Sequence, residues 1–255
     1  MRIHILGSGT STGVPVIGCS CAVCKSTNPK NQRTRASIAI EFAESRFILI
    51  DTSPEMRLQV LAQGIDKIEA VLYTHMHADH VHGFDDLRAF WFNSKRELPV
   101  YLLPEYEEEL KSKFSYAFMD TGYKGAIPQV RVNLIKDESF SLCDLKVEPI
   151  RLSHGGVDTC GFKIGSFLYA TDFKVFPEDK IKAWSNKIEL MVASGIHFGE
   201  HATHSVVPET LELFEKLGVR RGVISHLSHE VEYLRDSSRL PKEVEFAYDG
   251  MIIDL

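Results

Sequence analysis

The sequence predicts an α/β fold in which mixed sheets carry helices on their outer faces. Short runs of β-branched and large apolar residues recur along the whole chain, and helical stretches separate the later runs. Of the 255 residues, 44% are hydrophobic, which is enough for a sizeable core. Because no low-complexity linker or solenoid-length repeat interrupts the pattern, residues 1–255 are expected to form a single domain.

The individual elements follow from apolar runs, helical spacing and turn residues. Strands are predicted at residues 3–6, 37–42, 47–50, 70–74, 146–150, 161–164, 167–170, 190–193, 219–224 and 251–253. Helices are predicted at residues 54–62, 84–91, 104–119, 177–184 and 208–217, most of them opened by a proline.

Composition and charge exclude several classes of protein. The chain has 29 Lys and Arg against 35 Asp and Glu, a formal net charge of −6, which argues against nucleic acid as a general partner. No apolar run is long enough for a membrane-spanning helix, and the opening residues lack the apolar segment of a secretory signal. The expected location is therefore cytoplasmic, with no membrane partner.

A cluster of histidines in the segment THMHADHVHG follows the predicted strand 70–74 directly. Alternate side chains of an extended segment share a side, so His75, His77 and Asp79 can converge on one point. A turn into a helix would bring His80 to a neighbouring position, whereas His82 is expected to point elsewhere. Imidazoles and carboxylates are common ligands of Zn²⁺ and Mn²⁺, so the segment predicts a metal site.

Three further candidate ligands, His154, Asp172 and His226, stand just beyond predicted strands. Ligands of open α/β sheets collect at strand ends, where loops can reach in. Asp172 is suited to bridge two cations because a carboxylate has two oxygens.

The HMHADH segment and these three outlying residues resemble the metallo-β-lactamase superfamily of hydrolases. The likeness covers nearly the whole chain, including an opening GSGTSTGVP and an ILIDTSPE segment. It implies a four-layer αββα sandwich with a dinuclear centre. The ligands that it implies are His75, His77 and His154 for the first metal, Asp79, His80 and His226 for the second, and Asp172 between them. Asp51 is either a partner that orients a ligating histidine or the N-cap of the helix at 54–62.

A second metal site is indicated by Cys19, Cys21 and Cys24. The C-x-C-x₂-C spacing supplies three thiolates, whereas a closed structural Zn²⁺ site needs four ligands. Within the superfamily the cluster resembles PhnP-type phosphodiesterases, which act on ribose cyclic phosphates. That resemblance implies that His229, three residues after His226, completes a structural Zn²⁺ site. Three reduced thiols in a loop are the alternative.

The function implied by the resemblance is that of a metal-dependent phosphodiesterase. Two divalent ions (Zn or Mn) and a bridging hydroxide would hydrolyse a small cyclic or nucleotide-like phosphodiester. Asp79 and His204 are the expected catalytic residues, His204 as general acid or oxyanion stabiliser. His197 and His201 are expected to be spectators, or one of them to line the pocket.

Other interpretations remain open at this stage. The same fold could serve a thioesterase or an RNA-processing nuclease, or the chain could be a non-catalytic metal-binding scaffold. Lys30, Arg33 and Arg35 form either a phosphate anchor or a solvated basic loop. A homodimer is the assembly that the resemblance implies.

Overall fold

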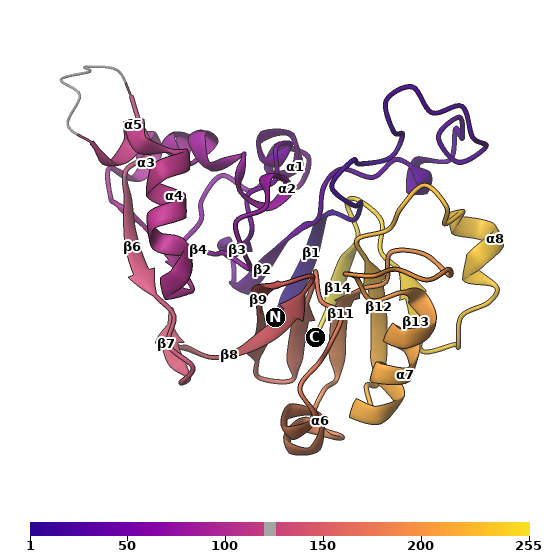
Figure 1. Cartoon of the computed structure of the whole chain (residues 1–255). Helices are drawn as coiled ribbons and strands as arrows, with labels where there is room; N and C mark the ends of the chain where they lie inside the picture. The colour runs from indigo at the N-terminus through magenta and orange to yellow at the C-terminus, as the bar shows by residue number, and fades with distance from the viewer. Residues whose placement is uncertain (120–125) are drawn as a thin grey trace.

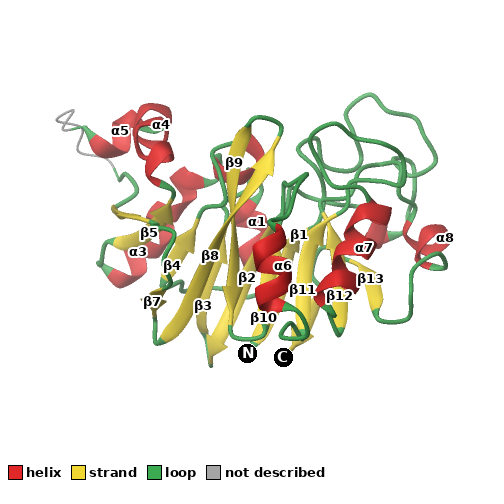
Figure 2. Cartoon of the chain, turned by 60° about the horizontal axis from the view of Figure 1, so that its bottom comes forward, coloured by secondary structure: helices red, strands yellow, loops and turns green. Residues whose placement is uncertain are grey.

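The computed structural model describes residues 1–119 and 126–255. It has two seven-stranded sheets packed face to face with helices on the outside, as Figures 1 and 2 show. The predicted four-layer αββα sandwich is therefore confirmed. None of the helices in residues 1–119 and 126–255 is long and apolar enough to span a membrane.

Each sheet has an antiparallel half and a parallel half. The first sheet has the order β14 (Ile252–Asp254), β1 (Arg2–Gly7), β2 (Ser37–Ala43), β3 (Arg46–Ile50), β4 (Ala70–Leu72), β5 (Leu98–Leu102) and β6 (Val130–Leu134). The second has the order β13 (Val244–Phe246), β12 (Arg221–Ser225), β11 (Leu190–Ser194), β10 (Phe167–Ala170), β9 (Val157–Ile164), β8 (Leu145–His154) and β7 (Phe140–Leu142). Strands β3 to β6 and β10 to β13 are parallel, so their carboxyl ends share an edge of each sheet.

Helices cover the outer face of each sheet. Those of the first half are α1 (Met56–Ala62), α2 (Ala78–Val81), α3 (Arg88–Ser94), α4 (Glu107–Lys113) and α5 (Ser115–Phe118). Those of the second half are α6 (Glu178–Trp184), α7 (Val207–Leu217) and α8 (Tyr233–Ser237). Short 3₁₀ turns occur at η1 (Pro29–Asn31), η2 (Phe84–Leu87) and η3 (Pro104–Tyr106).

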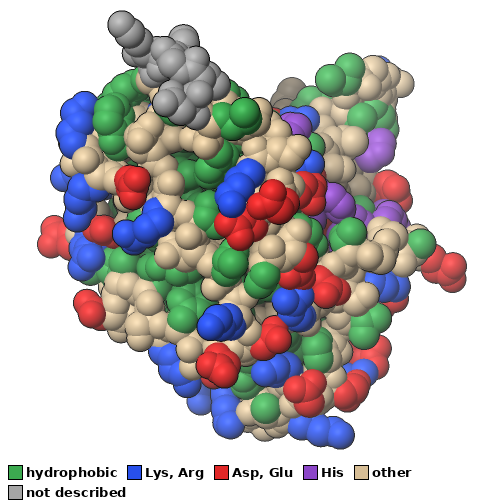
Figure 3. All heavy atoms as spheres, turned by 60° about the vertical axis from the view of Figure 1, so that its left-hand side comes forward, with side chains coloured by type: hydrophobic (Ala, Val, Ile, Leu, Met, Phe, Trp, Pro, Cys, Tyr) green, Lys and Arg blue, Asp and Glu red, His purple; other side chains and the backbone are tan. Residues whose placement is uncertain are grey.

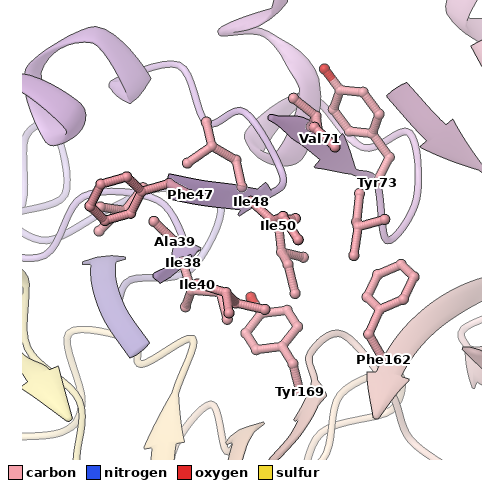
Figure 4. Close-up of a cluster of buried hydrophobic side chains, with 14 of the residues drawn as sticks. Ile38, Ala39, Ile40, Phe47, Ile48, Ile50, Val71, Tyr73, Phe162 and Tyr169 are labelled. Atoms are coloured by element: carbon pink, nitrogen blue, oxygen red, sulfur yellow. The ribbon is translucent and has the colours of Figure 1, made fainter. Parts of the chain in front are cut away.

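The main core lies between the sheets. Figure 4 shows Phe162 of β9 and Tyr169 of β10 facing Ile50 of β3, whereas the ring of Tyr73, just after β4, points away from them. All four side chains are at most 1% exposed. The intervening residues of β10, such as Leu168, pack instead under α6 and α7. Strands buried on both faces have continuous apolar sequences, which is why β10 reads as an unbroken apolar run.

The structure corrects several predicted boundaries. The helix predicted at 104–119 is divided into η3, α4 and α5, because Phe114 leaves the helical region (φ −120°, ψ 41°) and its ring stacks on Phe84. Strands β8 and β9 extend well beyond residues 146–150 and 161–164 and form one long hairpin. Consequently His154 is the last residue of β8 and does not lie beyond the strand.

Candidate active site

Residues of the candidate site lie where strands of both sheets end. Asp51 follows β3, Asp172 follows β10 and His226 follows β12 directly. All three have positive φ angles, of 63°, 51° and 58° respectively. A left-handed backbone at a residue other than glycine costs about 1–3 kcal/mol, and such strain concentrates at functional sites. The abrupt turns place the three side chains in one group at the end of the sandwich.

The first triad of candidate ligands consists of His75, His77 and His154. Their ligand atoms all lie within 4.8 Å of one another. His154 Nδ1 is 3.0 Å from the Thr203 carbonyl oxygen, which can only accept, so Nδ1 carries the proton. The lone pair of His154 Nε2 is therefore left for an ion.

The second triad consists of Asp79, His80 and His226, with the same 4.8 Å limit between ligand atoms. His80 is on α2, as the predicted turn into a helix requires. His82, by contrast, is exposed and stands outside both triads.

Asp51 orients one histidine of each triad. Its carboxylate lies 2.7 Å from His80 Nδ1 and accepts both the backbone N–H and the hydroxyl of Thr74, each at 2.8 Å. Because the Thr74 hydroxyl donates to Asp51, its oxygen accepts from His75 Nδ1 at 3.0 Å. The N-cap alternative is wrong, since α1 begins at Met56 and its N-cap residue is Glu55.

Asp172 lies between the triads. Its Oδ2 is 3.1 Å from His80 Nε2 and its Oδ1 is 3.2 Å from His226 Nε2. Yet both histidine nitrogens, and His75 Nε2, are buried without a hydrogen-bond partner. The atoms are close but misaligned for hydrogen bonds, as expected when ligand atoms point toward a shared ion position between them. Because an unsatisfied buried polar group costs about 1–3 kcal/mol, this donor set fits divalent cations, which would satisfy it.

The charges of the cluster favour a cation as well. Burial would raise the pKa of Asp172, but the imidazoles of His226 and His80 hold it well below its usual value. Burial would lower the pKa of His80, but the carboxylates of Asp172 and Asp51 raise it well above the usual value. The Asp172 carboxylate is therefore ionised and attracts positive charge to this point.

Two members of each triad line one pocket of about 300 Å³, His77 and His154 from the first and Asp79 and His226 from the second. Its wall also includes Asp172, Ser11, Val157, Thr203 and His204. His204 Nδ1 is 3.3 Å from Asp172 Oδ1 without a hydrogen bond. Burial lowers the pKa of His204 to about 3, so its ring is neutral near neutral pH. The structure thus places His204 beside the candidate ligands, as predicted.

The cysteine cluster is also assembled. The Sγ atoms of Cys19, Cys21 and Cys24 lie 3.3, 3.5 and 3.5 Å from His229 Nδ1. The Cys24 backbone N–H donates to Cys21 Sγ and lowers the pKa of Cys21 to about 6, whereas burial raises the pKa of Cys24 to about 11. Three sulfurs around one imidazole nitrogen match the donor set of a closed zinc site.

The three basic residues near this cluster do not form a phosphate anchor. Arg33 is 2% exposed and donates to the carbonyls of Ser228 and Val231, each at 2.9 Å. Lys30 Nζ lies over the rings of Tyr233 and Tyr248, and Arg35 pairs with Glu55. None of the three lines the pocket formed by the described residues. The alternative of a solvated basic loop is also wrong for Arg33, because its buried guanidinium donates hydrogen bonds to the segment after His226.

Sequence reasoning missed the threonines that support the ligands. Thr74 links His75 to Asp51, and the Thr203 carbonyl fixes the His154 ring. Thr74 precedes the histidine segment and could have been inspected for this role. No sequence signal pointed to Thr203, because its backbone carbonyl makes the contact.

Figure 3 shows histidines gathered at one part of the surface and acidic and basic side chains interspersed over the rest of that face.

Residues 46–227 match the beta-lactamase superfamily domain. A crystal structure described as a new diphosphatase from the PhnP family is 34% identical, covers 99% of this chain and 97% of its own, and has a TM-score of 0.91. The chain therefore belongs to the beta-lactamase superfamily and, within it, to the PhnP family.

More distant structures share the fold. Zn²⁺-bound PqqB from Methylobacterium extorquens is 20% identical over the full length of both chains, with a TM-score of 0.80. The short form of human tRNase Z is 17% identical, covers 100% of this chain and 99% of its own, and has a TM-score of 0.70. A Porphyromonas gingivalis protein named octanoyltransferase is 38% identical over 100% of this chain, which spans 52% of that relative. This chain thus covers about half the length of that curated relative.

Proposed function

We propose that this protein is a metal-dependent phosphodiesterase for a small cyclic or nucleotide-like phosphodiester. The observation that carries the proposal is the pair of triads with Asp172 between them, of which Asp172 and two members of each triad line one pocket. Two divalent cations at this point would supply Lewis acidity and positive charge, which suit an anionic phosphoester. A pocket of about 300 Å³ lies at the lower end of ligand-site volumes and favours a small substrate.

The proposed ligands divide as the resemblance implies. The first ion would be held by His75, His77 and His154, the second by Asp79, His80 and His226, with Asp172 shared. Zn²⁺ and Mn²⁺ both suit these nitrogen and oxygen donors. The cysteine cluster with His229 would hold a structural Zn²⁺, because its four ligands leave no open position.

The protein's own residues would prepare the site in three ways. Asp51 holds the rings of His80 and His75 with their Nε2 atoms toward the cluster. The Thr203 carbonyl does the same for His154. Near neutral pH the neutral His204 ring would donate a hydrogen bond to the leaving oxygen. Its role would therefore be oxyanion stabilisation rather than general-acid catalysis by a charged imidazolium.

Hydrolysis of a phosphoanhydride is the second candidate function. It is favoured by the 34% identical PhnP-family structure, which is described as a diphosphatase. Both candidates use the same pocket and differ only in the leaving group. A homodimer and a cytoplasmic location stay predictions.

The test is a hydrolysis panel on manganese- and zinc-loaded protein. It compares ribose 1,2-cyclic phosphate and bis(4-nitrophenyl) phosphate with a nucleoside diphosphate and an octanoyl thioester. We expect diester turnover that falls by more than about a thousandfold in Asp79→Ala, because loss of a ligand disables the centre. Asp66→Ala, the same change at an exposed carboxylate, should leave turnover unchanged. Turnover of the diphosphate alone would favour the second candidate, and turnover of the thioester alone would contradict both.

A further inference from the structure

His201 makes hydrogen bonds that its expected role as a spectator does not explain. It lies in the loop between β11 and α7, the same loop that carries His204. Its Nδ1 is 3.3 Å from the backbone nitrogen of Thr203 and 3.1 Å from that of His204. A single imidazole nitrogen thus accepts from two successive N–H groups, so His201 fixes the backbone at these two residues.

That stretch of backbone is connected to the first triad. The Thr203 carbonyl accepts from His154 Nδ1, which determines which nitrogen of His154 faces the cluster. Thr203 also packs closely against Gly155, where an added Cβ would lie 2.5 Å from Thr203 Cγ2. A shift of Thr203 would therefore change the orientation of His154.

The same backbone sets the position of a pocket residue. The His204 side chain lines the pocket, with Nδ1 3.3 Å from Asp172 Oδ1. The rings of His201 and His204 are 4.9 Å apart, whereas His201 itself belongs to neither triad. His201 therefore contacts the site through its neighbours.

We propose that His201 is a positioning residue, which holds His204 at the leaving-group side of the pocket and, through Thr203, orients His154. The effect on turnover rests on the proposed function, because it requires that His204 assist the reaction. The effect on the loop does not, since it follows from the two N–H contacts alone.

The variants that test this role differ in whether they keep the acceptor. His201→Asn retains an oxygen acceptor at nearly the position of Nδ1, whereas His201→Leu retains bulk without an acceptor. We expect His201→Leu to lower kcat for the diester by about tenfold or more with little change in KM, because displacement of an assisting group costs turnover and not ground-state binding. His201→Asn should restore kcat to within about threefold of wild type, since its loop is held again.

A double-mutant cycle separates positioning from a general loss of structure. In the His204→Ala background, His201→Leu should cause only the part of the loss that acts through His154, so the two effects should not add. Equal fold-losses in the two backgrounds would overturn the assignment to His204.

A readout without substrate keeps the proposal distinct from the proposed function. In zinc-loaded protein, hydrogen exchange of the Thr203 and His204 amides should be faster in His201→Leu and close to wild type in His201→Asn. Unchanged exchange in His201→Leu would overturn the proposal. If wild-type protein turns over no diester, the proposed function fails, while the exchange measurement still decides the role of His201.

Discussion

At the scale of single residues, Asp51 has the widest influence on the site. It is fully buried and contacts His80 directly and His75 through the Thr74 hydroxyl. Partners that orient metal ligands commonly affect ion affinity by about 10–100-fold when they are replaced. Because Asp51 serves one histidine of each triad, it should influence both ions.

Asp51→Asn tests this influence. The amide keeps the shape of the side chain but cannot accept from both donors of Thr74. We expect the affinity for two ions to fall by about 10–100-fold in a competition titration against a chelator. Asp66→Asn, at an exposed position, serves as the control. Unchanged affinity for both ions would show that Asp51 does not orient the ligands.

At the scale of elements, the long segment between β1 and β2 is held by isolated backbone bridges and by side chains, and not by a sheet of its own. Residues 8–36 contain only the short turn η1, yet they contact the segment that follows β12 through the cysteine cluster and Arg33. In Figure 1 part of this indigo segment lies beside α8, in the yellow part of the chain. His226 and His229 are three residues apart, so the same short segment serves both clusters.

Removal of one thiolate should loosen this segment. Cys21→Ser leaves the cluster with three strong ligands, and we expect tryptic cleavage after the exposed Lys25 to accelerate by about tenfold, which corresponds to a loss of roughly 1.4 kcal/mol in local opening free energy. A chelator should produce the same acceleration in wild type. The matched control is Cys143→Ser, since Cys143 lies outside the cluster. Equal cleavage rates in wild type, Cys21→Ser and Cys143→Ser would show that the cysteine cluster does not restrain this segment.

The sequence predicted the elements that decide the fold better than those at its edges. Runs such as residues 47–50 and 167–170 consist of apolar and aromatic residues, and they became the central strands β3 and β10. Four strands were missed. Pro99 interrupts the apolar run of the internal strand β5, and β6 is a half-exposed edge strand with alternating polar residues. Strands β7 and β13 have only three residues each, with a polar one in the middle.

The site shows a similar division. The spacing of the HMHADH segment is local, so the sequence alone indicated His75, His77, Asp79 and His80 as ligands. The partners from other strands, His154, Asp172 and His226, needed strand ends and a resemblance. The burial of Arg33 could not be predicted, because it depends on backbone carbonyls of a segment about 195 residues further along the chain.

At the scale of the whole molecule, the core between the sheets should determine global stability. Phe162→Ala removes a ring that is 0% exposed, and we expect the free energy of unfolding to fall by about 3–5 kcal/mol in urea titrations. Phe162→Leu, which keeps most of the volume, should cost considerably less.

That residues 1–255 form a single domain remains a prediction. It requires one cooperative unfolding transition, with the same midpoint by two spectroscopic probes. Two separate transitions would contradict it.

Two ions held by the two neighbouring triads can be counted on each chain by native mass spectrometry of zinc-loaded protein. We expect three ions in wild type, two in a Cys19→Ser and Cys21→Ser double variant, and one in a His75→Ala and His80→Ala double variant that keeps only the cysteine site. Asp66→Ala should retain three. A wild-type chain with a single ion, or a His75 and His80 variant that still binds three, would contradict the claim.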